Sequence, residues 1–397
     1  MLRDRTVLLA VSGGIAACKA PEIVRALSAA GARVRVVMTA SAHEFVTPLA
    51  LQTLSGEPVA RDLFDLTQES EIGHIDLADS ADVVLVAPAT ANLIGKIANG
   101  IADDLLTTVL LATRAPIVLA PAMNVHMFEE PRFAENLNRV REKGMHVVEP
   151  DEGLLACGYE GKGRLPDPEI LLEGVRAALA PDDLAGETVL ITAGPTREPL
   201  DPVRYLSNRS SGKMGYALAR SALRRGARVV LVSGPTSLAA PRGAELVAVE
   251  TAAEMAEAVR GGAPQAGIVI AAAAVADYTA AEVGSQKEAK TKGALALNLV
   301  GTTDIVAECV PRDAGRFVAG FAAETHDVEE RARAKMVRKR LDMIVANDVS
   351  AADAGFDVDT NRITILDAEE SRSYPLLDKD AVADRILDRI VALRVRG

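Results

Sequence analysis

The sequence predicts an α/β protein built from two doubly wound, Rossmann-like domains with mostly parallel sheets. A strand–turn–helix–strand pattern opens the chain and recurs about 180 residues later. Several later segments are continuously apolar, as is typical of strands that helices cover on both faces of a sheet. A length of 397 residues is also more than one hydrophobic core usually holds.

The first pattern starts with an apolar strand at residues 6–11, followed by a Ser-Gly-Gly turn. A helix over residues 15–31 then ends at a glycine, and residues 32–39 form a second strand. Two apolar runs predict further buried strands at residues 81–89 and 115–122. The first half therefore has the elements of one doubly wound sheet.

The second half repeats this order with a strand at residues 188–193, a loop, a helix at 213–226 and a strand at 227–234. Three apolar runs predict its remaining buried strands, at residues 266–276, 316–324 and 341–348.

The boundary between the halves is predicted near residues 180–186, where a helix is followed by Pro181-Asp182-Asp183. This gives two domains, residues 1–182 and residues 186–397.

The composition excludes several classes of function. A net charge of −11, the absence of Trp and an aromatic content of 3% argue against a nucleic-acid-binding surface. The three cysteines, Cys18, Cys157 and Cys309, are too few and too scattered for a disulfide framework or a zinc site. We therefore expect a cytoplasmic protein.

The N-terminus has some features of a lipoprotein signal, because two arginines precede an apolar run that ends at Cys18. Against this interpretation, residues 12–14 interrupt the run and Asp4 lies in its charged part. No run reaches the ~18 apolar residues that crossing a bilayer requires. We therefore expect no membrane association.

Polar residues follow several predicted strands of the first half. Ser12-Gly13-Gly14 opens a helix, where backbone N–H groups favour a phosphate, although a tight turn without a ligand is the alternative. Thr39, Thr90 and Asn92 follow other strands at the same predicted sheet edge.

The segment PAMNVHMF, residues 121–128, follows the predicted strand at 115–122 and reaches the same edge. Met123 and Met127 have the spacing of helical packing, and Asn124 has the position of a helix cap. The residues alone leave packing and chemistry open.

Here the sequence resembles a known family. The segments VSGGIAACK, APATAN, GHI, PAMNVHMF and ACGYEGKGR look like those of flavin-dependent cysteine decarboxylases. They look more closely like the decarboxylase half of the bifunctional phosphopantothenoylcysteine decarboxylase / phosphopantothenate–cysteine ligases of coenzyme A synthesis. That family usually closes its PxMNxxM motif with Trp, and Phe128 stands here, so a flat apolar side chain remains.

The resemblance implies FMN, which takes a hydride from the substrate's CH2–SH group and later returns it, so that the thioaldehyde can act as electron sink for the departing carboxylate. Asn124 would hold that carboxylate, His74 would serve the proton transfers, and Cys157 would protonate the enethiol. Taken alone, His74 is more typical of a surface residue and Cys157 of a small buried one. The implied FMN-binding residues are Ser12, Gly13, Gly14, Thr39, Thr90, Asn92 and Met123.

In the second half, residues 193–219 are the most specific stretch. Residues 210–213, Ser-Ser-Gly-Lys, open a helix and suit phosphate oxygens, but Met214 stands where a Walker A loop needs Ser or Thr. This stretch resembles the ligase half of the same family, as do AAAAVADY, TTDIV, GFAAET and KMVRKRLDMIVANDV.

The ligase resemblance implies that CTP activates the carboxylate of 4′-phosphopantothenate as an acyl-cytidylate, from which the amine of cysteine displaces CMP. Asn208 would stabilise the acyl-cytidylate, Arg204 would bind phosphopantothenate, and Asp277 would position Mg2+ or a ribose hydroxyl. The implied CTP residues are Ala271, Ala272, Ala273, Asp277, Lys287, Thr303, Asp304, Ile305, Val306, Phe321, Lys335 and Lys339.

One motif departs from the family. The Lys-x-Lys-Lys pattern appears here as KEAKTK, in which Lys287 keeps its place, Ala289 replaces the second lysine, and Lys290 or Lys292 is its substitute. A solvated charged loop is the alternative interpretation of these lysines.

By the same resemblance we expect a homo-oligomer with trimeric decarboxylase contacts and dimeric ligase contacts, a dodecamer in total. Two rivals remain. A dinucleotide oxidoreductase would need a GxGxxG turn that neither half has, and a non-catalytic flavin-binding partner protein would bind flavin without releasing CO2.

Overall fold

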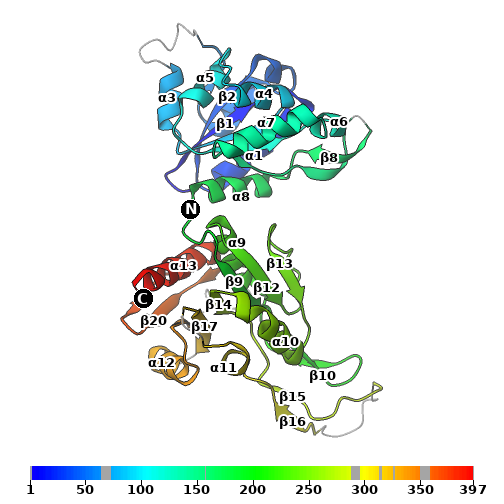
Figure 1. Cartoon of the computed structure of the whole chain (residues 1–397), viewed down its shortest axis with the longest axis vertical. Coiled ribbons are helices and arrows are strands. Elements are labelled where there is room, and N and C mark those ends of the chain that lie inside the picture. Colours follow the sequence, from blue (N-terminus) through cyan, green and yellow to red (C-terminus); the bar gives the residue numbers. More distant parts are fainter. Residues whose placement is uncertain are drawn as a thin grey trace. The chain divides into compact units, whose positions relative to one another are not determined.

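The structure is a computed structural model that describes residues 2–63, 73–156, 158–287, 296–312, 315–324, 327–348 and 358–396. The chain divides into two compact units, Met1–Ala180 and Pro181–Gly397, which are described separately below (Figure 1).

The N-terminal unit contains one six-stranded sheet in which all neighbouring strands are parallel. The order 3-2-1-4-5-6 is that of a doubly wound Rossmann-like sheet, so the predicted fold class is confirmed here. In that order the strands are β3 (Val59–Ala60), β2 (Arg33–Met38), β1 (Thr6–Val11), β4 (Val83–Ala89), β5 (Ile117–Pro121) and β6 (His146–Val147).

Helices cover both faces of this sheet, and each face has its own core cluster. One face packs against α1 (Ala20–Ala29), α2 (Pro48–Ser55) and α8 (Pro168–Leu179). The other packs against α3 (Gly73–Ser80), α4 (Ala91–Ala98), α5 (Leu105–Ala112) and α7 (Pro131–Glu142).

The helix predicted over residues 15–31 is wrong in its first turn. A 3-10 helix, η1 (Ile15–Lys19), precedes α1, because Pro21 lies in the first turn of α1, where its missing N–H costs nothing. A second 3-10 helix, η2 (Ala40–Glu44), follows β2.

Two small elements lie beyond the carboxyl end of β5. The short helix α6 (Val125–Phe128) follows it, and an antiparallel hairpin is formed by β7 (Asp151–Leu154) and β8 (Glu160–Arg164). We call residues 151–156 and 158–164 the flap hairpin.

The C-terminal unit contains an eight-stranded sheet that is parallel from β13 to β18 and antiparallel in its last two pairs. In spatial order its strands are β13 (Glu245–Ala248), β12 (Arg228–Ser233), β9 (Thr188–Ala193), β14 (Ile268–Ala271), β17 (Phe317–Glu324), β18 (Met343–Asp348), β20 (Ile363–Asp367) and β21 (Ser371–Ser373).

The strand predicted over residues 266–276 ends at Ala271. The next residues leave the sheet because they bond to the loop after β9, where the Ala274 N–H donates to the Gly194 carbonyl at 2.9 Å. Apolar residues can therefore also line a loop, and here they line a cavity.

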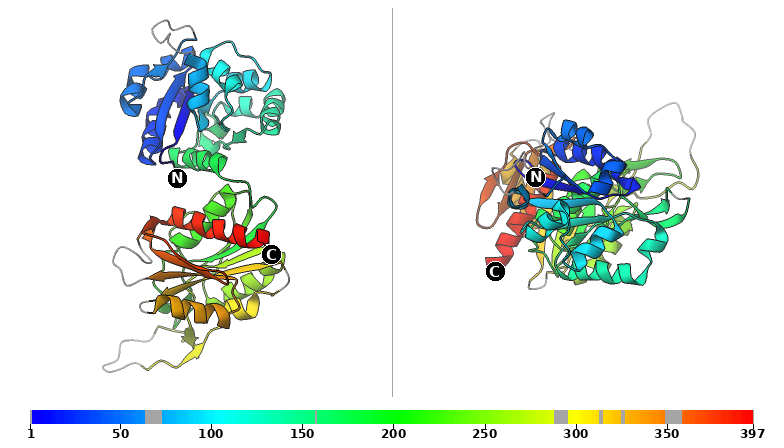
Figure 2. Two further views of the ribbon diagram at one scale, coloured as in Figure 1. Left: turned by 90° about the vertical axis from the view of Figure 1, so that its left-hand side faces the viewer. Right: turned by 90° about the horizontal axis from the view of Figure 1, so that it is seen from above.

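Helices α9 (Lys213–Arg224) and α13 (Lys379–Arg396) pack on one face of this sheet. Helices α10 (Ala252–Gly262), α11 (Ile305–Cys309) and α12 (Val328–Arg338) pack on the other, so that α12 and α13 lie on opposite sides of the strands (Figure 2). The shorter elements are β10 (Arg197–Pro199), β11 (Tyr205–Ser207), η4 (Ala263–Gln265), β15 (Tyr278–Ala280), β16 (Leu299–Gly301), β19 (Thr360–Asn361) and β22 (Leu377–Asp378). Within the described residues, no helix has the length and apolar character needed to span a membrane.

Candidate active sites

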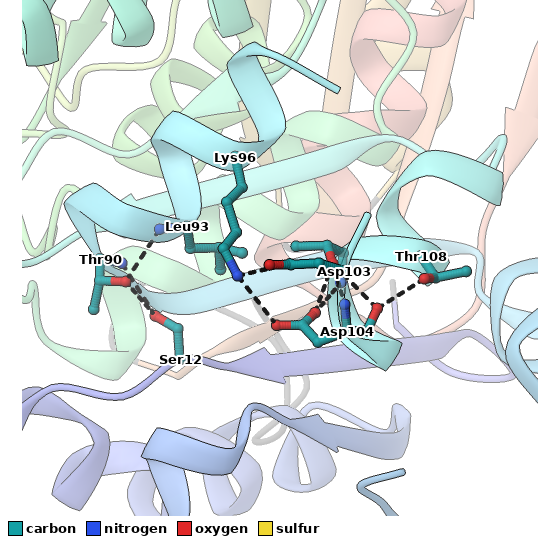
Figure 3. Close-up of polar contacts among 8 residues, drawn as sticks. Ser12, Thr90, Leu93, Lys96, Asp103, Asp104 and Thr108 are labelled. Carbon is teal, nitrogen blue, oxygen red and sulfur yellow. Dashed lines mark hydrogen bonds and ion pairs between the residues drawn. The ribbon is translucent and has the colours of Figure 1, made fainter. Parts of the chain in front are cut away.

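The ends of β1 and β4 are joined by two of the predicted binding residues. Ser12 is buried, and its Oγ donates to the Pro88 carbonyl at 2.7 Å. The same oxygen lies 3.2 Å from Thr90 Oγ1 (Figure 3). The Thr90 N–H donates back to Ser12 Oγ at 3.1 Å, and Thr90 Oγ1 caps α4 by accepting from Leu93. Because β1 and β4 flank the point where the strand order reverses, this link lies where such sheets bind ligands.

The turn after β1 approaches η2 closely. A Cβ on Gly13 would lie 2.3 Å from Ser41 Cβ, so only glycine fits there, and Gly14 has its nearest neighbour at 3.4 Å, Thr90 Cγ2. The turn therefore keeps its backbone N–H groups close to the ends of β2 and β4.

Two buried polar atoms near the end of β2 have no hydrogen-bond partner, Thr39 Oγ1 and His43 Nε2. A buried polar atom without a partner is costly, so a bound group with polar atoms would stabilise both. The hydroxyls and phosphate of a flavin nucleotide suit them, and the expected cofactor therefore fits this edge. His43 was missed by the sequence analysis, although its position four residues after Thr39 was the available signal.

The remaining predicted residues of this unit are spread around the edge. Met123 packs against the core cluster that includes β4 and β5, His74 is half-buried on α3, and Asn92 is exposed on α4. Asn124 caps α6, with its Oδ1 accepting from the His126 N–H at 2.9 Å. Cys157 lies outside the described residues.

A cluster of charges that the sequence analysis missed fixes the connection from α4 to α5. Lys96 Nζ lies 2.7 Å from Asp103 Oδ1 and 3.8 Å from Asp104 Oδ2 (Figure 3). Asp104 caps α5 by accepting from the Thr107 N–H, and the hydrogen bond to Asp103 raises the pKa of Lys96. This cluster positions α4, whose first residues carry the Thr90 cap.

In the C-terminal unit, a cavity of about 650 Å3 lies at the carboxyl ends of β9, β14, β17 and β18. Its lining includes most of the predicted CTP and substrate residues. These are Asn208, Ala271, Ala272, Ala273, Asp277, Thr303, Asp304, Ile305, Val306, Phe321, Lys335 and Lys339.

Two lysines from the implied set of CTP residues lie in this cavity. Lys335 Nζ donates to the Phe321 carbonyl at 2.9 Å, and Lys339 Nζ contacts the Asp304 carboxylate at 2.9 Å. Burial raises the pKa of Asp304, but its bonds to Lys339 and to backbone N–H groups outweigh that effect and hold the pKa below its ordinary value. Asn208 Nδ2 donates to the Val275 carbonyl at 2.9 Å.

Among the polar residues that line the cavity, Asn347, Asn361 and Lys379 were missed by the sequence analysis. Lys213 also lines it and belongs to the Ser-Ser-Gly-Lys stretch that was predicted to suit phosphate oxygens. Asn347 Oδ1 is buried without a partner, while its Nδ2 lies 3.3 Å from Asn361 Oδ1. Lys379 stands at the first position of α13, which was the one signal that the sequence offered for it.

The charges of the lining favour an anionic ligand. The basic residues are Arg209, Lys213, Lys335, Lys339 and Lys379, and the acidic ones are Asp277 and Asp304. A triphosphate fits this excess of cations.

Two predicted residues do not line the cavity. Arg204 lies in the loop between β10 and β11, where its Nε donates to Asp201 Oδ2 at 2.6 Å. Lys287 is exposed, and its neighbours Ala289, Lys290 and Lys292 lie outside the described residues. Within the part of the chain that is described, no group of three or more His, Cys, Asp or Glu side chains is arranged to hold a metal ion, and Asp277 is exposed.

Comparison with known proteins assigns each unit to a family. Residues 1–180 match the Flavoprotein family, and residues 184–393 match the DNA/pantothenate metabolism flavoprotein C-terminal domain.

Relatives match over nearly the full length. The chain is 50% identical over 398 residues to the coenzyme A biosynthesis bifunctional protein CoaBC of Bacillus subtilis (strain 168), covering 99% of this chain and 98% of that protein. It is 48% identical over 395 residues to CoaBC of Escherichia coli (strain K12), covering 98% and 97%. A crystal structure of the C-terminal domain of a CoaBC protein is 40% identical, covers 54% of this chain and all (100%) of that one, and has a TM-score of 0.47. The chain therefore belongs to the coenzyme A biosynthesis bifunctional proteins, with a Flavoprotein domain followed by a DNA/pantothenate metabolism flavoprotein C-terminal domain.

Proposed function

We propose that the chain catalyses two consecutive reactions of coenzyme A synthesis. Residues 186–397 would join 4′-phosphopantothenate to cysteine with CTP and Mg2+, and residues 1–182 would decarboxylate the product to 4′-phosphopantetheine with FMN. Family membership of both units supports this proposal, and the observation that carries it is the basic cavity of about 650 Å3 in the C-terminal unit.

In the ligase unit, a substrate carboxylate oxygen bonds to the α-phosphorus of CTP while the bond to the β-phosphate oxygen breaks and pyrophosphate leaves. The amine of cysteine then attacks the acyl carbon, and CMP leaves. Lys335 and Lys339 would neutralise the triphosphate, and Asn208 would hold the acyl-cytidylate. Asp277 would position Mg2+, whose charge assists departure of pyrophosphate.

In the decarboxylase unit, the turn after β1, Thr39 and Thr90 would bind the polar part of FMN. The cofactor, when bound, supplies reversible hydride acceptance from the CH2–SH group of the substrate. Asn124 would orient the departing carboxylate by hydrogen bonds without trapping it in an ion pair.

Two further residues of this unit would move protons at the substrate sulfur and carbon. His74 would accept the thiol proton, and Cys157 would return a proton to the enethiol.

The protein would act as a cytoplasmic homo-oligomer on small molecules. Exposed apolar side chains gather on the two hairpins β10–β11 and β15–β16, which contact each other. They include Tyr205, Tyr278, Leu299 and Val300, and they suit a contact between two copies of the ligase unit. Trimeric decarboxylase contacts and a dodecamer are proposed by family analogy.

The test is to purify the protein, record its visible spectrum, and incubate it with 4′-phosphopantothenate, cysteine, CTP and Mg2+. Flavin absorbance, CMP formation and 4′-phosphopantetheine formation are expected. Asn124→Ala should accumulate the cysteine adduct, while Lys287→Ala should block adduct formation. A flavin-containing protein that forms the adduct but releases no CO2 would overturn the decarboxylase half, and normal ligation by Lys287→Ala would remove that lysine from the site.

A further inference from the structure

The flap hairpin lies directly on the turn that carries Asn124. The Met123 N–H donates to the Gly163 carbonyl at 3.0 Å. Gly163 has a φ of +146°, and a Cβ added there would lie 2.3 Å from the Met123 carbonyl oxygen. The two backbones therefore touch without a side chain between them.

Side chains on the flap hairpin extend this contact to α6. The rings of Tyr159 and His126 lie 5.0 Å apart, edge to face at 73°. Lys162 Nζ lies 5.3 Å from the centre of the Phe128 ring, within cation–π range. His126 and Phe128 both belong to α6, the helix that Asn124 caps.

Further contacts with α7 fix the positions of the Lys162 ammonium and of the Phe128 ring. Lys162 Nζ also lies 2.7 Å from Glu149, whose carboxylate is shared with Arg141 of α7. Phe128 packs against Phe133 of α7 at 5.6 Å, and Phe133 is buried. The ammonium is thus held between an anchored carboxylate and an anchored ring.

We propose that Lys162 and Tyr159 are positioning residues that lock the flap hairpin onto α6. Because α6 carries the Asn124 cap at one end and these two contacts along its length, the same helix sets the place of the carboxylate-binding amide and of the flap. This inference rests on the proposed decarboxylase function. It explains why Phe128 serves in place of the family's Trp, since any flat aromatic ring can accept the ammonium.

The amide hydrogen exchange rate of residues 158–164 in the full-length protein, read by mass spectrometry, measures how firmly the flap hairpin is held on α6. This measurement does not depend on catalytic activity. Lys162→Met removes a cation–π contact and an ion pair and should speed exchange about three- to tenfold. Phe128→Leu and Tyr159→Leu should each speed exchange roughly two- to fivefold. Phe128→Trp should exchange no faster than the wild type, since Trp is the best cation–π partner.

Lys143→Met is the matched control, because Lys143 caps the C-terminal end of α7 and its ammonium donates to the Ala98 carbonyl of α4. Among these variants, those with faster hydrogen exchange should have a lower kcat for decarboxylation. The rate of CTP-dependent ligation should be unchanged in all of them.

Three outcomes decide the matter. Exchange in Lys162→Met and Tyr159→Leu equal to that of Lys143→Met would refute the lock itself. Faster exchange with unchanged decarboxylation kcat would refute the positioning role. Absence of CO2 release from the wild type, whatever the exchange, would overturn the proposed function and the positioning role with it.

Discussion

Two glycines of the flap hairpin provide a sharp test of how it docks. Gly153 and Gly163 have the same φ of +146°, so an alanine at either position carries the same kind of backbone strain, about 1–3 kcal/mol. A Cβ on Gly153 would meet nothing within 4 Å, whereas a Cβ on Gly163 would meet the Met123 carbonyl oxygen at 2.3 Å. Only Gly163→Ala should therefore separate the hairpin from the turn.

The difference between the two variants follows from the contacts that are lost. Alanine at position 163 either forces its Cβ against the Met123 carbonyl, at about 1–3 kcal/mol of overpacking, or moves away and loses the bond to the Met123 N–H, about 1 kcal/mol. Gly163→Ala should thus loosen the docked hairpin by about 1 kcal/mol or more relative to Gly153→Ala. At 1.36 kcal/mol per tenfold, this is roughly fivefold faster exchange or more.

The assay is hydrogen exchange over residues 120–128 and 158–164, combined with decarboxylation and ligation rates of the same preparation. Ligation serves as an internal control, because the substitution lies in the N-terminal unit. Equal exchange in Gly153→Ala and Gly163→Ala would show that the close approach does not hold the hairpin, and the reasoning would fail.

Three further predictions concern other parts of the chain. Arg389→Met should lower the stability of the C-terminal unit by about 3 kcal/mol at neutral pH, since it leaves the buried Asp367 carboxylate without the Arg389 guanidinium at 2.7 Å. Burial raises the pKa of Asp367, but its bonds to Arg389 and to the Glu369 and Glu370 N–H groups together outweigh that effect and hold the pKa below its ordinary value. The stabilisation is therefore present above the unfolded pKa and is lost as the pH falls through the folded value, and calorimetry showing an equal deficit at pH 7 and pH 3 would contradict this. Lys339→Met should raise the KM for CTP about tenfold in a pyrophosphate-release assay, and an unchanged KM would place the triphosphate elsewhere. Ser12→Ala breaks the link between β1 and β4 and should weaken flavin binding about tenfold by fluorescence titration, whereas an unchanged Kd would mean that Thr90 holds its place alone.

The architecture could be predicted because the sheets are buried on both faces. Strands such as β1, β4 and β5 are nearly continuous apolar runs, and Gly31 and Gly226 follow helices α1 and α9. The exception was the segment after β14, where four alanines and a valine have the apolar character of a strand but bond to the loop after β9. Periodicity cannot distinguish the two cases, because both bury small side chains.

The candidate sites could be predicted only where a motif is contiguous. Most residues of AAAAVADY and all of TTDIV do line one cavity. Asn347, Asn361 and Lys379 come from three separate elements, β18, β19 and α13, and only the fold brings them to that cavity. Arg204 shows the opposite case, since its ion pair with Asp201 holds it in a hairpin loop that no local pattern distinguishes from a binding loop.

The edge strand β21 of the C-terminal sheet affects how copies of the protein can associate. Its last strand, β21, has three residues, all exposed, with Arg372 at the centre. An edge strand this short and charged leaves few unpaired backbone N–H and C=O groups to which a neighbouring polypeptide could bond. It therefore protects this edge of the sheet from edge-to-edge aggregation. Two copies of the C-terminal unit would therefore associate through side-chain contacts elsewhere on its surface, and not by adding a strand next to β21.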